Sequence, residues 1–460
     1  GASATFDVSV IDWKDRFSGD NGTNPAASIF SDAREISGIQ FHRNRLALGG
    51  AENVVMSQAG DFFNFYQRDA NNLVDSDPID VALGSDQVTI IDDIVSFRKS
   101  LSIFTKAGRQ FELNAPEALT PATAAITATT AYETLSITPV TRGNMMYFVA
   151  KNKGYGALYE YFYDEAQVQN VAAEISAHAY KLLPTTIKSL VSSTNNNMIM
   201  VLPESSNKIH VYRLFWNGNT KEMSAWSTST FDSTYKIADL AIIENDCWML
   251  VDDGTQFTLE KLALEHDVAK ANWPYVIHLD RQLELTGSFS TNTTWTIPFT
   301  DATIDTIILG PDFSSPGTVV TVTSSGTTVT AAGANYTAGE VTLGRSYTKT
   351  LELNQPFRRN VNNVPVADAR LDIKRILTLH DQTFDYRIRR NWANRTDVSK
   401  SFTSTTADDG DLLSLLGGNV GGPGPASNMA TFFIENTTPK PSTITGIEYT
   451  VDYEPRRSEP

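Results

Sequence analysis

The feature that most constrains this chain is a hairpin pattern that returns about every 48 residues. In each copy an apolar run leads into a turn with Gly, Asn or Ser, and an aromatic-rich run follows. A lone hairpin cannot bury its inner face, but hairpins stacked around an axis can. The spacing lies in the range of propeller blades. The turns step by 48, 48, 51 and 47 residues, and they are marked by Gly60, Gly108, Gly156, Asn207 and Gly254.

We therefore predict an all-β fold with a β-propeller-like domain over residues 36–265 and blades of about 48 residues. Glycine tolerates the positive φ that tight hairpins need, so the blade turns are assigned to Gly60, Gly108 and Gly254. The aromatic residue three positions later is assigned to blade packing, which gives Phe63, Phe111 and Phe257. The alternative is a run of unrelated hairpins in a β-sandwich, and the even spacing favours the propeller.

The flanking regions have different compositions. Residues 1–35 are predicted to form an N-terminal linker or extension. The regular spacing ends after Leu264, and residues 287–350 hold 24 Ser or Thr but six charged residues. Thr favours strands and offers a polar outer face, so we predict an inserted β-sandwich or ribbon domain over 266–350, a candidate distal tip.

Larger residues return from Tyr347 onward, and residues 351–460 are predicted to supply returning β-strands that complete the body. The alternating run near the end places Ile447, Tyr449, Val451 and Tyr453 on one face. The glycine-rich stretch 417–425 is predicted to be a flexible loop. Helical periodicity is scarce, and its best candidate lies near residues 170–180.

The net charge is −16, from 37 basic and 53 acidic residues. Phosphate binding needs clustered Lys and Arg, so this charge argues against a protein that grips nucleic acid through a basic surface, although DNA could still move past it. The most basic stretch, 386–395, interleaves Arg with aromatic residues, as single-strand binders do. A strand with its Arg face in solvent or in a subunit contact is the favoured interpretation.

No motif indicates catalysis or a cofactor. The six histidines lack the i, i+4 pairing around Glu, and one cysteine cannot build a thiolate zinc site. Cys247 lies in a strand-like run and is expected to be a buried, inert thiol. A Walker loop is absent from the sequence. We therefore predict a non-enzyme with no catalytic, cofactor-binding or metal-binding residue.

Some propellers are glycosidases, which leaves one alternative function open. The candidate carboxylates lie beside turns, where Asp commonly caps its own backbone. Residues 57–61 approach the sialidase turn but lack its third-position Asp and its closing Trp. A glycan-binding or glycan-cleaving propeller of a phage or cell surface remains the alternative. The carboxylates in question are Asp77, Asp80, Asp92, Asp93, Asp252 and Asp253.

The sequence lacks a run of 18 apolar residues and a leader followed by a cleavage site, so we predict no membrane span and no secretory signal. It begins Gly1-Ala2-Ser3 rather than with Met, as a processed or trimmed piece would.

A series of short motifs, in order from about Trp13 to the end, resembles the tail tubular protein B family, the tail nozzle of short-tailed, T7-like phages. The motifs are 41–48 (FHRNRLAL), 52–66 (ENVVMSQAGDFFNFY), 75–81 (DSDPIDV), 119–121 (LTP), 174–178 (EISAH), 224–227 (SAWS), 231–232 (FD) and 453–457 (YEPRR). Members of the family have a further amino-terminal region that is not found here.

The resemblance implies a structural virion protein in the short tail of a bacteriophage, forming a six-fold ring beneath the portal and adaptor. It implies a central channel through which DNA is ejected, with loops that can gate it. The implied partners are further copies of this chain, the adaptor (tail tubular protein A), tail fibres, and DNA that passes without specific binding. We add one physical expectation: acidic subunits around a channel repel DNA phosphates and let DNA slide.

Overall fold

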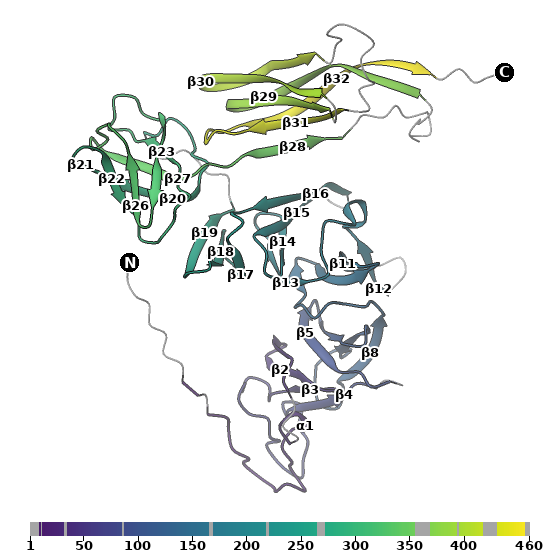
Figure 1. Cartoon of the computed structure of the whole chain (residues 1–460). Helices are drawn as coiled ribbons and strands as arrows, with labels where there is room; N and C mark the ends of the chain where they lie inside the picture. Colours follow the sequence, from purple (N-terminus) through teal and green to yellow (C-terminus); the bar gives the residue numbers. More distant parts are fainter. Residues whose placement is uncertain are drawn as a thin grey trace, which may run out of the picture. The chain divides into compact units, whose positions relative to one another are not determined.

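The computed structural model describes residues 9–10, 12–31, 35–84, 87–164, 169–217, 220–264, 272–354, 369–392, 395–416 and 430–455. The chain divides into two compact units, Gly1–Glu265 and His266–Pro460. Strands dominate both units, which confirms the all-β prediction (Figure 1). No helix among the described residues has the length and apolar character needed to cross a membrane.

The first unit contains five antiparallel sheets, each built from strands that follow one another in the chain (Figure 1). The first two sheets are β1 (Gly38–His42), β2 (Arg45–Gly50), β3 (Asn53–Met56), β4 (Ile79–Ala82), and β5 (Ile91–Phe97), β6 (Ser100–Thr105), β7 (Gln110–Asn114), β8 (Ala125–Thr130). The third and fourth are β9 (Val140–Arg142), β10 (Met145–Asn152), β11 (Tyr155–Asp164), β12 (Gln169–Glu174), and β13 (Ile187–Ser193), β14 (Met198–Pro203), β15 (Lys208–Asn217), β16 (Thr220–Thr230). The fifth has β17 (Lys236–Ile243), β18 (Asp246–Asp252) and β19 (Phe257–Ala263).

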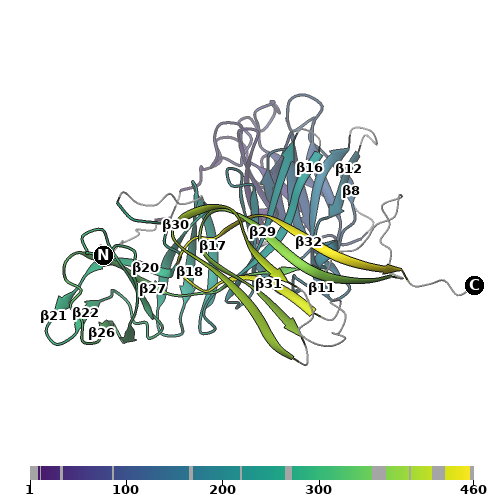
Figure 2. The same cartoon turned by 90° about the horizontal axis from the view of Figure 1, so that it is seen from above.

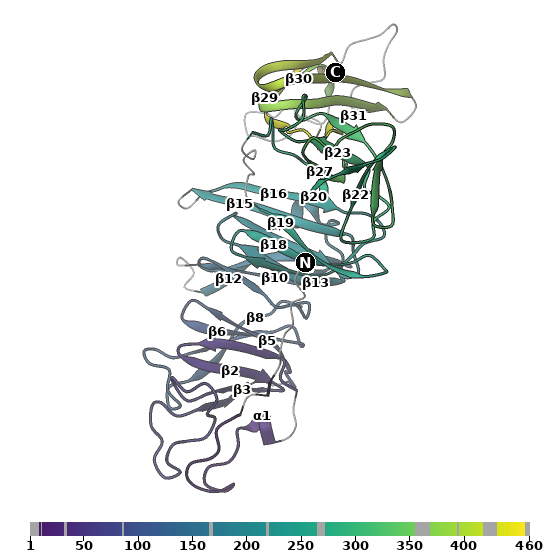
Figure 3. The same cartoon turned by 90° about the vertical axis from the view of Figure 1, so that its left-hand side faces the viewer.

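Successive sheets stack face against face and share a hydrophobic core at each junction (Figure 3). Side chains alternate along a strand, so neighbouring residues enter different cores. Ile103 packs against the first sheet, and the next residue, Phe104, packs against the third. Likewise Phe148 faces the second sheet and Val149 the fourth. Strands buried on both faces read as continuous apolar runs, which explains why the hairpins are so visible in the sequence.

The turn assignments are partly confirmed. Gly60, Gly108 and Gly254 all have positive φ, between 72° and 86°. Gly108 and Gly254 lie between the second and third strands of their sheets, but Gly60 follows β3, and the matching turn of the first sheet is at Ala51. Gly156 is also misplaced, since it pairs within β11. Gly60 has the sequence pattern of a hairpin turn because it lies in the long connection between β3 and β4, which contains a turn of its own.

The packing assignments of the aromatic residues are confirmed in one case out of three. Phe111 is buried between the first two sheets. The packing assignment of Phe257 is wrong, because Phe257 is 66% exposed on the fifth sheet. In the described part of this unit, no sixth sheet packs against that sheet. Phe63 is partly exposed and contacts Trp13 instead of an adjacent blade. The helical stretch expected at 170–180 is also wrong, because β12 pairs with β11 and a 3₁₀ turn, Ala177–Ala179, follows it.

The N-terminal segment packs on the outer face of the first sheet. A short helix, α1 (Ser28–Ser31), begins where the Asp80 carboxylate accepts hydrogen bonds from the Ser28 amide and hydroxyl, at 2.8 and 2.9 Å. Ile29 and Phe65 are buried with apolar residues of β2 and β3. Trp13 contacts three Phe rings at centroid distances of 5.5–5.8 Å.

The second unit begins with a small β-sandwich of two four-stranded sheets. One sheet has the order β20 (Asp280–Thr286), β27 (Glu340–Arg345), β23 (Thr306–Leu309), β24 (Val319–Thr321), and the other β21 (Ser288–Phe289), β22 (Thr293–Thr296), β26 (Thr328–Ala331), β25 (Thr323–Ser325). Trp295, Ile307 and Val341 are buried in the core between them. The Thr-Val alternation passes from one sheet to the other at Val322, which is buried.

The last sheet has long strands that bend strongly (Figure 2). Its strands are β28 (Lys349–Leu353), β29 (Ala369–Trp392), β30 (Arg395–Leu416), β31 (Ala430–Asn436) and β32 (Thr443–Pro455). One edge of β29 pairs with β30, while the other pairs first with β32 and then with β31. Register shifts between Thr378 and Asp385 bend the strand there.

The alternation predicted for the final strand is confirmed, because Ile447, Tyr449 and Val451 pack against the core of this sheet. The side chain of Tyr453 lies outside the described residues, as does the predicted glycine-rich loop at 417–425.

Candidate functional site

Three of the motifs that mark the resemblance meet at one buried arginine. Arg45 is 1% exposed, and its guanidinium donates hydrogen bonds to main-chain carbonyls. Two acceptors, the carbonyls of Asp75 and Asp77, lie at 2.8 and 2.6 Å in the motif 75–81. The others are the carbonyls of Ser57 at 2.8 Å, Ser76 at 3.3 Å and Leu119 at 3.4 Å. This arginine therefore holds the β3–β4 connection in place, which is an architectural role.

Two further motifs meet between the third and fourth sheets. The indole nitrogen of Trp226 donates to the carbonyl of Ile175 at 3.3 Å, joining the motifs 224–227 and 174–178. The Tyr212 ring lies 5.0 Å from the Trp226 ring, and its hydroxyl bonds with the Ser224 hydroxyl at 3.0 Å. These motifs fasten neighbouring sheets together, so they too are architectural.

The basic stretch at 386–395 lies largely on β29, and two of its arginines, Arg387 and Arg389, have acidic partners within the unit. Arg387 and Arg389 both bind Glu435, with closest contacts of 2.8 Å, and Arg389 also binds Asp397 at 2.7 Å. The guanidinium of Arg389 stacks over the Phe433 ring at 4.3 Å. Hydrogen bonds from Arg389 lower the pKa of Glu435. Glu435 therefore stays ionised, and its negative charge offsets the positive charges of Arg387 and Arg389. This face is therefore a paired strand surface, which does not favour the nucleic-acid alternative.

No metal centre forms among the described residues: no group of three or more His, Cys, Asp or Glu is placed to hold an ion. Cys247 is buried and free, and burial raises the pKa of its thiol to about 11, so it is protonated at neutral pH. Burial also lowers the pKa of His42 and of His278 to about 4, which keeps both neutral. His266 lies outside the described residues.

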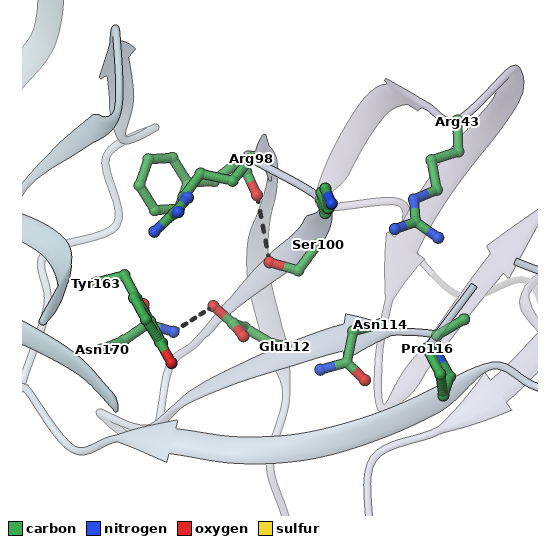
Figure 4. A pocket seen from close by; sticks show the side chains of 11 residues that line it. Arg43, Arg98, Ser100, Glu112, Asn114, Pro116, Tyr163 and Asn170 are labelled. Atoms are coloured by element: carbon green, nitrogen blue, oxygen red, sulfur yellow. Dashed lines mark hydrogen bonds between the residues drawn. The ribbon is translucent and has the colours of Figure 1, made fainter. Parts of the chain in front are cut away.

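One cavity of the first unit is lined by polar and charged side chains from three successive sheets (Figure 4). Its volume is about 340 Å³. Arg43 comes from the β1–β2 turn, and Arg98 and Lys99 form the β5–β6 turn. Glu112 and Asn114 lie on β7, while Tyr163 and Asn170 come from the third sheet. The cavity therefore exists only where the ends of three sheets meet.

Glu112 has hydrogen-bond partners on the second and third sheets. The amide of Asn170 donates to its carboxylate at 2.7 Å, drawn as a dashed line in Figure 4. Burial raises the pKa of Glu112, although hydrogen bonds from Ser100 and Asn170 and the charge of Arg98 oppose that shift. The guanidinium of Arg98 lies over the Tyr163 ring at 5.2 Å. Sequence reasoning missed this site because its members are spread over more than 120 residues, from 43 to 170.

Residues 1–459 match the family described as bacteriophage nozzle protein. The chain is therefore a structural component of a bacteriophage tail, and it belongs to that family. Over 290 residues it is 26% identical to tail tubular protein gp12 of Escherichia phage T7. The match covers 62% of this chain and 36% of that protein, so the chain spans about a third of the length of its curated relative.

Solved structures offer much weaker likenesses. Hsv2 of Kluyveromyces lactis is 9% identical with a TM-score of 0.30, covering 63% of this chain and 98% of that one. The computationally designed Ika8 protein is 9% identical with a TM-score of 0.28, covering 68% and 96%. Both scores are too low to bear on the fold.

Proposed function

We propose that this chain is a subunit of a homo-oligomeric ring, a hexamer, that forms the tail nozzle through which phage DNA is ejected. The observation that supports the proposal most strongly is the family match across residues 1–459. Six of the eight motifs that carry the resemblance hold sheets and loops together, as expected of a subunit in a rigid wall. The proposed partners are neighbouring copies, the adaptor (tail tubular protein A), tail fibres and passing DNA.

The charge of the chain suits such a channel. Each copy has a net charge of −16, and two arginines of the most basic stretch, Arg387 and Arg389, are paired with Glu435 and Asp397. A wall with unpaired cations would hold phosphates and slow the DNA, whereas an acidic wall repels them. We propose that acidic side chains line the channel. A channel whose wall is net basic would overturn this part of the proposal.

We propose that the chain works without catalysing a reaction. The described residues form no metal cluster, and their buried thiol and the imidazoles of His42 and His278 have pKa values that keep them uncharged. The Thr-rich domain at 266–350 is proposed to form the distal tip of the nozzle. Deleting its sandwich should leave ring assembly intact but impair infection, and a loss of assembly would count against this placement.

Native mass spectrometry of the purified chain, alone and mixed with the adaptor, tests the ring. The expected result is a species of six copies, 50.5 kDa each, either alone or on the adaptor. A monomer under both conditions that cleaves capsular polysaccharide would overturn the proposal and establish the glycan-cleaving alternative. Arg45→Met provides a folding-defective reference, since it removes the clamp on the β3–β4 connection.

A further inference from the structure

We infer that the cavity between the first three sheets is a binding site for a sugar that carries an oxoanion, a phosphate or a carboxylate. The cavity of about 340 Å³ has room for a ligand of monosaccharide size. Its lining combines three cations, Arg43, Arg98 and Lys99, with amides and one carboxylate. The inference is independent of the ring.

The cations are available to a ligand. Among the described residues, no carboxylate forms an ion pair with Arg43, Arg98 or Lys99. Arg43 donates one hydrogen bond to the carbonyl of Glu117 at 3.1 Å, and Arg98 stacks on Tyr163. Their remaining N–H groups can bind an oxoanion, which a guanidinium does with two parallel hydrogen bonds. On a chain of charge −16, such a cluster is a local exception.

The turns themselves do not require arginine. Arg43 and Arg98 have φ values of +44° and +54°, where Gly, Asn or Asp is the usual choice. The matching turns of the third and fifth sheets have Gly143 and Glu244, each at φ +57°. The first turn of the fourth sheet has Asn197 at φ +52°. Among the first turns of the five sheets, a cation at positive φ therefore occurs only in the two turns that border the cavity, where a bulky side chain is less favourable than Gly.

The carboxylate distinguishes a sugar from a simple anion. A site for phosphate alone would exclude Glu112, because like charges repel. Sugar hydroxyls, in contrast, are donors and need acceptors such as the oxygens of Glu112 and Asn114. The arrangement, with cations from two turns and acceptors on β7, matches a ligand with an anionic end and a hydroxylated body.

Titration of the intact chain with glucose 6-phosphate and with glucuronate, followed by calorimetry or ligand-observed NMR, tests the site. The first titration tests a phosphate as the oxoanion and the second tests a carboxylate. We expect saturable binding of at least one of the two sugars. Glucose and inorganic phosphate, each half of the ligand, should bind at least tenfold more weakly. Equal binding of inorganic phosphate, or no binding of either anionic sugar, would overturn the inference.

Variants locate the binding. Arg98→Gln and Arg43→Gln should each weaken binding about tenfold, since each removes a charge-assisted hydrogen bond. Lys153→Gln is the matched control, because Lys153 is also a cation at positive φ, +47°, in a hairpin turn outside the cavity. Glu112→Gln should strengthen the binding of inorganic phosphate several-fold and can keep the Asn170 hydrogen bond.

Two results would contradict the site. An equal loss of binding in Lys153→Gln would indicate unspecific charge. Competition by duplex DNA that depends on Arg43 and Arg98 would assign the cations to a nucleic acid instead.

Discussion

The first and fifth sheets of the N-terminal unit have the same antiparallel order, but their outer faces differ. The first sheet is covered by residues 12–31 and by the β3–β4 connection, and Phe65 there is 7% exposed. On the fifth sheet, Phe257 and Leu259 are 66% and 67% exposed. In a stack of repeats each inner sheet is covered by its neighbours, while the end sheets need caps of another kind. Here the described part of the unit caps one end and leaves the other open.

This difference explains why the motifs around Arg45 lie at the first sheet, where no neighbouring sheet covers the outer face. Inner sheets are covered on both faces by apolar side chains of their neighbours, and the motifs 174–178 and 224–227 add one hydrogen bond between the third and fourth sheets. The first sheet depends on a long connection, and Arg45 ties that connection down through main-chain carbonyls. Stability should therefore be more sensitive to change at the first sheet than at the fifth.

The largest expected effect is that of Arg45→Met. It leaves several buried carbonyls without a donor, which should lower the free energy of unfolding by about 3–5 kcal/mol. Lys261→Met on the fifth sheet is the control, because its half-exposed ion pair with Asp246, at 2.6 Å, is worth at most about 1 kcal/mol. Denaturant unfolding of the full chain measures the free energy of unfolding of both variants. Equal losses in the two variants would contradict the expected difference between the first and fifth sheets.

Truncating a phenylalanine at each end compares the two faces directly. Phe65→Ala empties a buried position and should cost about 3–4 kcal/mol. Phe257→Ala should change stability by less than about 0.5 kcal/mol, because that side chain is mostly exposed. Hydrogen exchange should localise the first loss to the β3–β4 connection. A large cost at Phe257 would mean that its face is covered in the intact chain.

Acid should weaken the first junction. His42 is buried, its Nδ1 lies 2.8 Å from the Ser96 hydroxyl on the second sheet, and burial lowers its pKa to about 4. Its stabilising contribution is complete above about pH 6.5 and is lost as the pH falls toward 4, by at most about 3 kcal/mol. In the variant His42→Gln, the free energy of unfolding should depend less on pH over this interval. The variant His178→Gln, at an exposed position, serves as the control. Identical profiles for the two variants would refute this prediction.

The smallest expected effect is at the edge of the cap. Trp13 is about half exposed and touches three Phe rings, so Trp13→Ala should cost about 1 kcal/mol. The clearer readout is faster proteolysis within residues 12–31. Unchanged proteolysis would show that the segment is held by Ile29 and the Asp80 hydrogen bonds alone.

The repeated hairpins could be predicted because local patterns produce them: strands buried on both faces leave continuous apolar runs, and their turns need glycine. Gly60 was misassigned because the loop after β3 imitates a hairpin turn. Phe257 was misassigned because sequence does not reveal which sheet is last in a stack. The first error is a local ambiguity between two kinds of turn, whereas the second concerns long-range arrangement, which local propensity does not determine.

The cavity could not be predicted, since its lining comes from turns and strand ends of three sheets. One signal was present in the sequence. Arg43 and Arg98 lie 55 residues apart, close to one repeat, and both occupy the first turn of their sheets. Aligning the repeats by their first turns, rather than by the glycine markers, would have brought the two cations together.

The most direct test of the nozzle proposal is an electron cryomicroscopy image of the phage particle, averaged along its tail axis. The expected result is six copies of this chain around an axial channel, with a channel wall of net negative charge. A single copy, or copies away from the axis with no part in the channel wall, would contradict the proposal.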